Sequence, residues 1–127
     1  MPRKKMIGGY SQPIERTKIY DVPALELAKA IIEKDPFSHI HIPMLADKAG
    51  INEFKLKVGF RELFQTSPYQ YRLHLCLEHA KILLEETDDT IDQISSRVGF
   101  DTYNGFSTAF KKAYGYAPTD YRNHQSA

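Results

Sequence analysis

FDTYNGFSTAFKKAYGYAPTDYR, residues 100–122, carries the strongest indication of the fold. Apolar residues recur in it every three or four positions, which predicts a short helix over residues 102–113 with one buried face. The apolar residues of that face are Phe106, Ala109, Phe110 and Ala113. The other face carries hydroxyl groups, an amide and lysines, from Thr102, Tyr103, Asn104, Ser107, Thr108, Lys111 and Lys112. Such a face suits the base edges and phosphates of a nucleic-acid groove, although an ordinary solvated helix has the same pattern.

Most of this stretch has a counterpart earlier in the chain. Residues 42–51 match residues 91–100 at an offset of 49, and residues 56–72 match residues 106–122 at an offset of 50. The matched positions are Ile42 and Ile91, Leu45 and Ile94, Ala46 and Ser95, Lys48 and Arg97, Gly50 and Gly99, Ile51 and Phe100, Leu56 and Phe106, Phe60 and Phe110, Arg61 and Lys111, Phe64 and Tyr114, Pro68 and Pro118, Tyr71 and Tyr121, and Arg72 and Arg122. Each copy therefore consists of a short helix, a glycine turn, a second helix, a proline and an aromatic residue.

The anatomy of each copy is that of a helix-turn-helix, in which two helices are joined by a turn that often contains glycine. The small residues Ala46 and Ser95 stand where the two helices of each copy would cross, and they allow close packing. In DNA-binding proteins of this type the second helix, the recognition helix, enters the major groove. The repeat therefore predicts two recognition helices, over residues 53–64 and 102–113.

The remaining segments also have helical patterns. We predict helices over residues 21–35, 43–50, 68–86 and 91–98, and a last helical turn from residue 118. The predicted buried faces include Leu63 in the helix over residues 53–64 and Tyr69 in the helix over residues 68–86. We therefore expect an all-α fold with a flexible tail or linker at residues 1–20, a first helix-turn-helix subdomain at 21–67, a linker helix at 68–86 and a second helix-turn-helix subdomain at 87–124.

The length of the linker helix suggests how the two copies could act together. Its 19 residues would span about 28 Å at ~1.5 Å per residue. Major-groove faces on one side of B-DNA recur every ~34 Å. We hypothesise that the two recognition helices enter successive major grooves of one duplex.

The overall charge does not by itself indicate nucleic-acid binding. The chain has 17 basic and 16 acidic residues and a net charge of +1, whereas nucleic-acid-binding domains are typically basic. Its charges are nevertheless clustered, because acidic residues gather at residues 85–92 while the predicted recognition helices carry lysines and an arginine. A helical protein-interaction module that has lost DNA binding remains the alternative.

Catalytic and metal sites have no support in the sequence. No nucleophile, base and orienting group form a set, and no spacing of cysteine, histidine and carboxylate residues suits a metal ion. We therefore expect no enzymatic activity and no cofactor. The single cysteine, Cys76, and the absence of a long apolar run predict a cytoplasmic protein with no membrane partner.

Two motifs resemble the AraC-type (AraC/XylS) family of bacterial transcription regulators. They are LADKAGINEFKLKVGFRELF at residues 45–64 and SPYQYRLHLCLEHAKILLEETDDTIDQISSRVGFDTYNGFSTAFKKAYGYAPTDYR at residues 67–122. The resemblance implies about seven helices in two homeodomain-like helix-turn-helix subdomains that bind double-stranded promoter DNA. It also implies contact with RNA polymerase and, if there is an effector ligand, its binding by a domain outside this chain.

The resemblance further implies which residues contact DNA. The family's base-contacting positions fall on Phe54, Lys57, Val58, Tyr103, Asn104, Gly105 and Thr108. The phosphate-contacting positions fall on Lys55, Arg61, Thr102, Ser107, Lys111 and Lys112. Cys76 and His79 depart from the pattern, because the family often has arginine at these positions.

Overall fold

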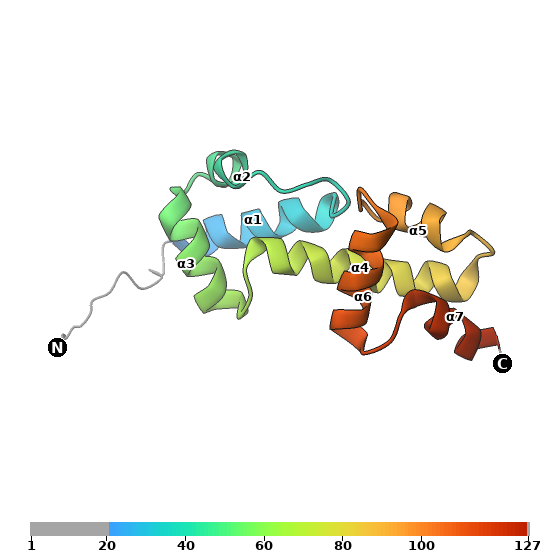
Figure 1. The fold of residues 1–127 in the computed structure, drawn as a ribbon. Coiled ribbons are helices and arrows are strands. Elements are labelled where there is room, and N and C mark those ends of the chain that lie inside the picture. The colour runs from blue at the N-terminus through green and yellow to red at the C-terminus, as the bar shows by residue number, and fades with distance from the viewer. Residues whose placement is uncertain (1–20, 127) are drawn as a thin grey trace. The chain divides into compact units, whose positions relative to one another are not determined.

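The computed structural model describes residues 21–126, and the predicted tail at residues 1–20 lies outside that range (Figure 1). The described range contains seven α-helices and no strand, so the all-α prediction is confirmed. The helices are α1 (Val22–Lys34), α2 (Ile42–Ala49), α3 (Glu53–Phe64), α4 (Pro68–Glu86), α5 (Ile91–Arg97), α6 (Tyr103–Tyr114) and α7 (Pro118–Ser126).

The helix boundaries agree with the prediction at α3 and α4, differ by one residue at each end of α1 and α2, and also differ in α5, α6 and α7. Helix α6 begins at Tyr103 rather than Thr102, because Thr102 has extended backbone angles and acts as the N-cap. Helix α7 has nine residues, so the expected single turn was too short. Helix α5 ends at Arg97, one residue earlier than predicted.

Side-chain caps explain why three of the helices begin where they do. The Asn52 side chain accepts a hydrogen bond from the backbone N–H of Lys55 (2.8 Å), and Thr102 accepts one from Gly105 (3.0 Å). Thr90 and Gln93 form a capping box in front of α5, in which each side chain accepts a hydrogen bond from the other residue's backbone N–H. Each cap satisfies N–H groups that the first helical turn leaves without a partner.

The described chain divides into two compact units. The first unit contains the chain up to Lys34 together with Ile40–Tyr71, and the second contains Asp35–His39 together with the chain from Arg72 onward. We refer to Asp35–His39 as the strap, because it belongs to the second unit although both of its neighbouring segments belong to the first. Helix α4 contains the boundary between the units, at Tyr71 and Arg72.

The first unit packs α1 against α2 and α3 around a small apolar core. Its buried residues are Leu25, Ala28, Ile32, Leu45, Ala46, Ala49, Leu56 and Phe60. The prediction that Leu63 is buried was wrong, since its side chain is 36% exposed. Leu63 has the right helical phase but lies in the last turn of α3, beyond Phe60. The ring of Phe64 packs edge-on against Phe60 there, with 4.7 Å between centroids.

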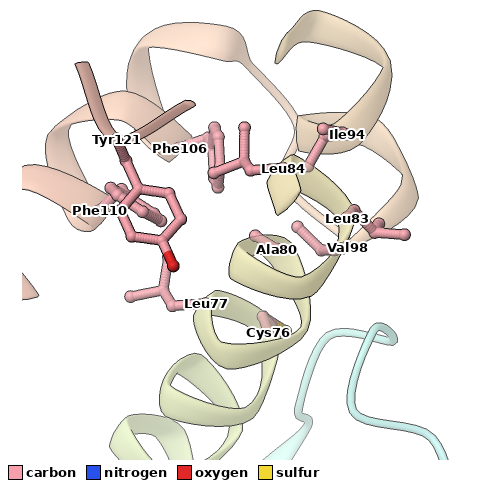
Figure 2. Packing of buried hydrophobic residues seen from close by; sticks show 10 residues of the cluster. All are labelled: Cys76, Leu77, Ala80, Leu83, Leu84, Ile94, Val98, Phe106, Phe110 and Tyr121. Carbon is pink, nitrogen blue, oxygen red and sulfur yellow. The ribbon is translucent and has the colours of Figure 1, made fainter. Parts of the chain in front are cut away.

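The second unit has a larger core, which Figure 2 shows between α4, α5, α6 and α7. Phe106 and Phe110 are fully buried, as the sequence predicts. Ala113 is exposed, contrary to the prediction, and Tyr114 packs edge-on against Phe110 at 4.7 Å. Ala113 occupies the repeat position of Leu63, so the apolar pattern overestimates burial at the same place in both units. In each, the aromatic residue that follows covers the core instead.

Helix α4 corrects one further expectation. Tyr69 was predicted to be buried and is 55% exposed. The buried residues in this part of α4 are instead Arg72 and Cys76, which are 5% and 0% exposed. An arginine was not included in the predicted apolar face because a charged side chain is rarely buried unless its donors are satisfied.

Contacts in the structure reveal that the repeat is longer than the sequence comparison indicated. Leu25, Ala28 and Ile32 of α1 correspond to Leu77, Ala80 and Leu84 of α4, all at an offset of 52, and all six residues are buried. Helix α1 is therefore the counterpart of the second half of α4. Each unit consequently contains a supporting helix in front of its helix-turn-helix.

A cluster of lysine, tyrosine and glutamate recurs in both units. Lys29 lies over the rings of Phe64 (5.1 Å) and Tyr71 (5.6 Å), and the Tyr71 hydroxyl donates to Glu33. In the second unit the equivalent Lys81 lies over Tyr114 (4.6 Å) and Tyr121 (5.7 Å), and the Tyr121 hydroxyl donates to Glu85. This cluster joins the supporting helix of each unit to the aromatic residue that ends its recognition helix and to the tyrosine seven residues later.

Candidate nucleic-acid interface

Helix α3 presents the first group of predicted DNA-contacting residues, with all of them except Arg61 in its N-terminal half. Phe54 is 59% exposed, an unusual position for a phenylalanine side chain, and Lys57 and Arg61 are also exposed. Val58 is half-buried. Lys55 is half-buried as well, and its ammonium group lies 3.8 Å from a carboxylate oxygen of Asp21.

Helix α6 presents the second group. Tyr103 is 39% exposed, and Asn104, Gly105 and Thr108 are exposed on the same N-terminal part of the helix. Lys111 and Lys112 are exposed in its second half, and Ser107 is half-buried. Thr102 is exposed but uses its hydroxyl oxygen as an acceptor in the N-cap. Its hydroxyl proton remains available for a donated hydrogen bond.

The exposed polar groups of both helices are available to a ligand. Within residues 21–126, the side chains of Lys57, Asn104 and Thr108 form no hydrogen bond or ion pair with another residue. The predicted contact residues therefore form one group in each unit. The predicted base contacts lie in the first half of the second helix of each motif, whereas Arg61, Lys111 and Lys112 lie in its second half.

The turn in front of each recognition helix holds the two helices of the motif together. Gly50 (φ 76°) and Gly99 (φ 91°) both have left-handed backbone angles, which favour glycine. Ala46 and Ser95 are buried at the helix crossing, as their size predicts. The Ser95 hydroxyl also donates to the backbone carbonyl of Thr102 (3.2 Å), so that α5 is bonded directly to the N-cap of α6.

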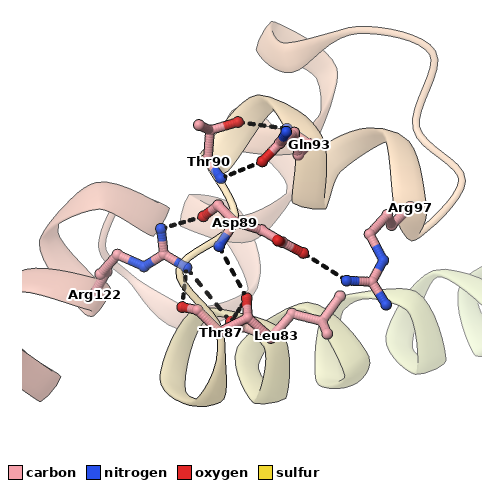
Figure 3. Close-up of polar contacts among 7 residues, drawn as sticks. All are labelled: Leu83, Thr87, Asp89, Thr90, Gln93, Arg97 and Arg122. Atoms are coloured by element: carbon pink, nitrogen blue, oxygen red, sulfur yellow. Dashed lines mark hydrogen bonds and ion pairs between the residues drawn. The ribbon is translucent and has the colours of Figure 1, made fainter.

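The connection between α4 and α5 is held by an arginine that the sequence comparison matched but gave no role. Figure 3 shows the guanidinium group of Arg122 donating to the backbone carbonyls of Leu83, Thr87 and Asp89. Its Nε also donates to the carbonyl of Leu84 (3.2 Å). Arg97 pairs with the Asp89 carboxylate at 2.5 Å. These contacts fix the start of α5, the first helix of the second motif.

Several acidic groups have partners inside the second unit. Asp89 pairs with Arg97, Glu85 accepts a hydrogen bond from Tyr121, and Glu78 accepts one from Tyr114 (2.6 Å). The bond to Glu85, together with burial, raises the pKa of Tyr121 to about 12. Part of the acidic stretch at residues 85–92 therefore joins α4 to α7, through Glu85, and the α4–α5 connection to α5, through Asp89.

The described residues give little indication of a metal site, a reactive thiol or a membrane-spanning helix. No group of three or more histidine, cysteine, aspartate or glutamate residues within 21–126 could hold a metal ion. Cys76 is buried, and burial raises the pKa of its thiol. Over the same residues, no helix combines the length and apolar character needed to cross a membrane.

Two helix-turn-helix units, each with a capped second helix and an exposed polar N-terminal face, define a DNA-binding protein of the helix-turn-helix class. Comparison with known proteins agrees. The model of a family described as "Helix-turn-helix domain" matches residues 45–124. The chain belongs to the AraC-type family of helix-turn-helix transcription regulators, and its fold is that of the family's DNA-binding domain.

Individual relatives are similar over most of this chain. The transcriptional activator RhaR of Yersinia pseudotuberculosis is 30% identical over 102 residues, which is 80% of this chain and 35% of RhaR. The C-terminal domain of AraT, a response regulator from Geobacillus stearothermophilus, superposes with a TM-score of 0.76 at 30% identity and covers 80% of this chain and 85% of that domain. A transcriptional regulator from Chromobacterium violaceum with an AraC-type DNA-binding domain gives a TM-score of 0.75 at 25% identity over 86% of this chain and 97% of that protein.

These comparisons confirm the predicted family, fold class and class of function, DNA-binding transcription regulation. The chain spans about a third of the length of the curated relatives that it matches. The family is one of transcription regulators rather than enzymes. The individual base and phosphate contacts remain predictions.

Proposed function

We propose that this chain binds double-stranded promoter DNA sequence-specifically, with α3 and α6 inserted into successive major grooves. The observation that carries this proposal is the duplicated geometry, in which each unit presents a capped recognition helix with available polar groups at its start. In DNA-binding helix-turn-helix proteins it is the N-terminal residues of this helix that meet the base edges. The 19 residues of α4 correspond to about 28 Å, comparable with the ~34 Å between major-groove faces.

The proposed base contacts differ between the two helices. The amide of Asn104 can form two hydrogen bonds with adenine, Lys57 suits guanine, and the ring of Phe54 suits the methyl group of thymine. The other proposed base contacts are Val58, Tyr103, Gly105 and Thr108. At Gly105 the absent side chain allows the helix backbone to approach the DNA closely. Thus α6 offers more hydrogen-bonding groups and α3 more apolar surface.

The proposed phosphate contacts surround these positions. Lys111, Lys112 and Arg61 are exposed cations whose side chains have no hydrogen-bond or ion-pair partner among residues 21–126, so they can approach a phosphate without losing one there. Lys55 lies near Asp21 and would have to share its charge between that carboxylate and a phosphate. Thr102 and Ser107 would donate hydroxyl protons. These contacts position the protein on the duplex but carry no sequence information directly.

The activity of the whole protein is also a proposal. We propose regulation of transcription in the cytoplasm, contact with RNA polymerase, and no enzymatic activity or cofactor. Any effector ligand would be bound by a domain outside this chain. These properties are those expected of the family. One relative of this chain, RhaR, is named a transcriptional activator.

The deciding experiment is selection of bound sites from a random duplex library, followed by measurement of affinity against salt concentration. We expect two half-sites about one helical turn apart, ~34 Å, and a log–log salt slope of about −0.9 per neutralised phosphate. Asn104→Ala should relax the base preference at one position. The matched variant Lys111→Ala should weaken all sequences alike and reduce the salt slope by about 1.

The alternative function is a helical protein-interaction module, which the net charge of +1 keeps open. It predicts absent or salt-insensitive DNA binding, and no enriched site in the selection. A single half-site would instead retain DNA binding but contradict the use of both recognition helices.

A further inference from the structure

Arg72 is a buried arginine with an unusual set of partners. Its side chain is in the second unit and is 5% exposed. Its Nε donates to the carbonyls of Pro36 (2.8 Å) and Ser38 (2.8 Å), and its Nη2 donates to those of Phe37 (3.1 Å) and Gly99 (3.4 Å). Three of these acceptors belong to the strap and the fourth to the turn between α5 and α6. One guanidinium group therefore joins the strap to the turn that precedes the recognition helix α6.

Further contacts hold the strap in the same place. The Cys76 thiol donates to the Pro36 carbonyl (3.2 Å), and the rings of Phe37 and His79 lie 5.1 Å apart. At the other end of the strap, His39 Nε2 lies 3.3 Å from a carboxylate oxygen of Asp101. The strap is therefore attached to α4 on one side and to the α5–α6 turn on the other.

Gly99 shows how closely the strap and the turn are packed. A Cβ atom at this position would overlap the carbonyl oxygen of Phe37 and lie 2.9 Å from Arg72 Nη2. Three residues later Thr102 caps α6, and Asn104 follows in its first turn. A change in the backbone of residues 99–101 would therefore alter the direction from which the first residues of α6 approach a ligand.

Arg122 provides an internal comparison, because it occupies the repeat position of Arg72. It too donates to backbone carbonyls, at Leu83, Leu84, Thr87 and Asp89. Thr87 is the repeat counterpart of Ser38, so both arginines hold the connection in front of the first helix of their own copy. These acceptors of Arg122 lie in residues 83–89, whereas the acceptors of Arg72 include the carbonyl of Gly99, in the α5–α6 turn.

We propose that Arg72 is a positioning residue for DNA recognition by α6. Arg72 donates hydrogen bonds both to the strap and to the carbonyl of Gly99, and it thereby holds the α5–α6 turn in one conformation. The turn in that conformation orients Thr102, Asn104 and the residues beside them. The planar guanidinium fork is required, because a lysine offers donors from a single point and cannot reach the same acceptors together. This inference rests on the proposed function of α6.

A purely structural role for Arg72 makes a different prediction. If Arg72 only stabilised the fold, its replacement would lower affinity for all DNA sequences in proportion to the loss of folded protein. Discrimination at a half-site is the ratio of the affinity for the selected DNA site to the affinity for a derivative in which that half-site is scrambled. If Arg72 positions α6, this ratio should fall at the half-site contacted by α6 and be kept at the half-site contacted by α3. The ratio of the two discriminations therefore separates the two roles.

The test uses the full chain with Arg72→Lys and Arg72→Gln, and Arg122→Lys as the matched control. The affinity of each variant is measured for the selected DNA site and for two derivatives, each with a different half-site scrambled. The α6 half-site is the one at which Asn104→Ala loses preference. For Arg72→Lys we expect discrimination at the α6 half-site to fall by about fivefold or more, within the range of one lost base contact. Discrimination at the α3 half-site should stay nearly unchanged, and Arg122→Lys should lower the melting temperature without this selective loss.

Three results would overturn the proposal. Equal loss of discrimination at both half-sites indicates a general effect on folding or affinity. Unchanged discrimination in a folded Arg72→Lys protein indicates that the α5–α6 turn keeps its conformation without the hydrogen bonds of Arg72. If neither Arg72 variant has the wild-type circular dichroism spectrum, Arg72 is a folding determinant rather than a positioning residue. Failure of the proposed function looks different, because the wild-type protein itself would then show no half-site discrimination.

Discussion

The turns of the two helix-turn-helix motifs share a glycine at the same repeat position but need it for different reasons. Gly50 and Gly99 both have positive φ angles, 76° and 91°. Around Gly50 no atom lies within 4 Å of the position that a Cβ would occupy. At Gly99 the strap fills that space. A duplicated motif therefore keeps its backbone conformation while one copy acquires a tertiary contact that the other lacks.

Substitutions in the cores of the two units should have the largest effects on stability, and those effects should be similar in the two units. Phe60 and Phe110 are repeat counterparts and both are fully buried. Replacing either by alanine should cost ~3–5 kcal/mol of stability, because a cavity remains where the ring was. Urea unfolding followed by circular dichroism measures this. The matched control Leu63→Ala removes a 36% exposed side chain and should cost within about 0.5 kcal/mol. A Phe110→Ala protein that unfolds at the wild-type urea concentration would contradict the assigned core.

The glycine comparison itself leads to the next prediction. Gly50→Ala meets only the cost of a left-handed backbone, about 1–3 kcal/mol. Gly99→Ala adds overlap with the Phe37 carbonyl, and overpacking of this kind typically costs a further ~1–3 kcal/mol. In thermal unfolding, the Gly99→Ala protein should therefore have a lower melting temperature than the Gly50→Ala protein. Equal melting temperatures would mean that the strap moves away at little cost, which would also weaken the role proposed for Arg72.

The repeated tyrosine–glutamate pairs predict a smaller, pH-dependent effect in both units. Burial and the bond to Glu33 raise the pKa of Tyr71 to about 12, and the bond to Glu85 and burial raise that of Tyr121 to about 12, from 10.0 in each case. Between these values the unfolded chain has released phenolic protons that the folded chain still holds. Stability should therefore be fully present below pH 10 and decline as the pH rises toward 12.

Substitution identifies which unit contributes to this decline. Tyr71→Phe and Tyr121→Phe each remove one titrating hydroxyl and should each make the loss of stability between pH 10 and 12 less steep. Urea midpoints measured across that pH range give the slope for each variant. The two effects should be similar in size, since the two pairs are equivalent. An unchanged slope in both variants would show that these hydrogen bonds do not persist in solution.

Much of the candidate interface was predictable from local patterns. The caps at Asn52 and Thr90 and the positive φ at Gly50 depend on residues within one turn of each other, and all three appear in the structure. The exposure of Phe54 and Tyr103 follows from their place outside the apolar stripes. The same pattern was wrong at Leu63, Ala113 and Tyr69, because periodicity gives the phase of a residue but not whether another element reaches it.

Other features could not be predicted because they join distant parts of the chain. Arg72 and the Pro36 carbonyl are 36 residues apart in sequence, and nothing local indicates that a strap between two helices of one unit packs in the other unit. The correspondence of α1 with the second half of α4 was also missed, although Leu25, Ala28 and Lys29 match Leu77, Ala80 and Lys81. That match requires a third offset, 52, which becomes convincing only when both sets make the same contacts.

The all-α fold, the two helix-turn-helix motifs and the family can be predicted from the amino-acid sequence alone. These depend on helical periodicity, caps and glycine turns, whose physical causes lie within a few residues. Three features are visible only in the folded chain: Arg72 is buried, the strap belongs to the second unit, and Gly99 lies against the carbonyl group of Phe37. Those features arise because buried donors and acceptors must find partners, and the partners are chosen by the packing of the chain rather than by their neighbours in sequence.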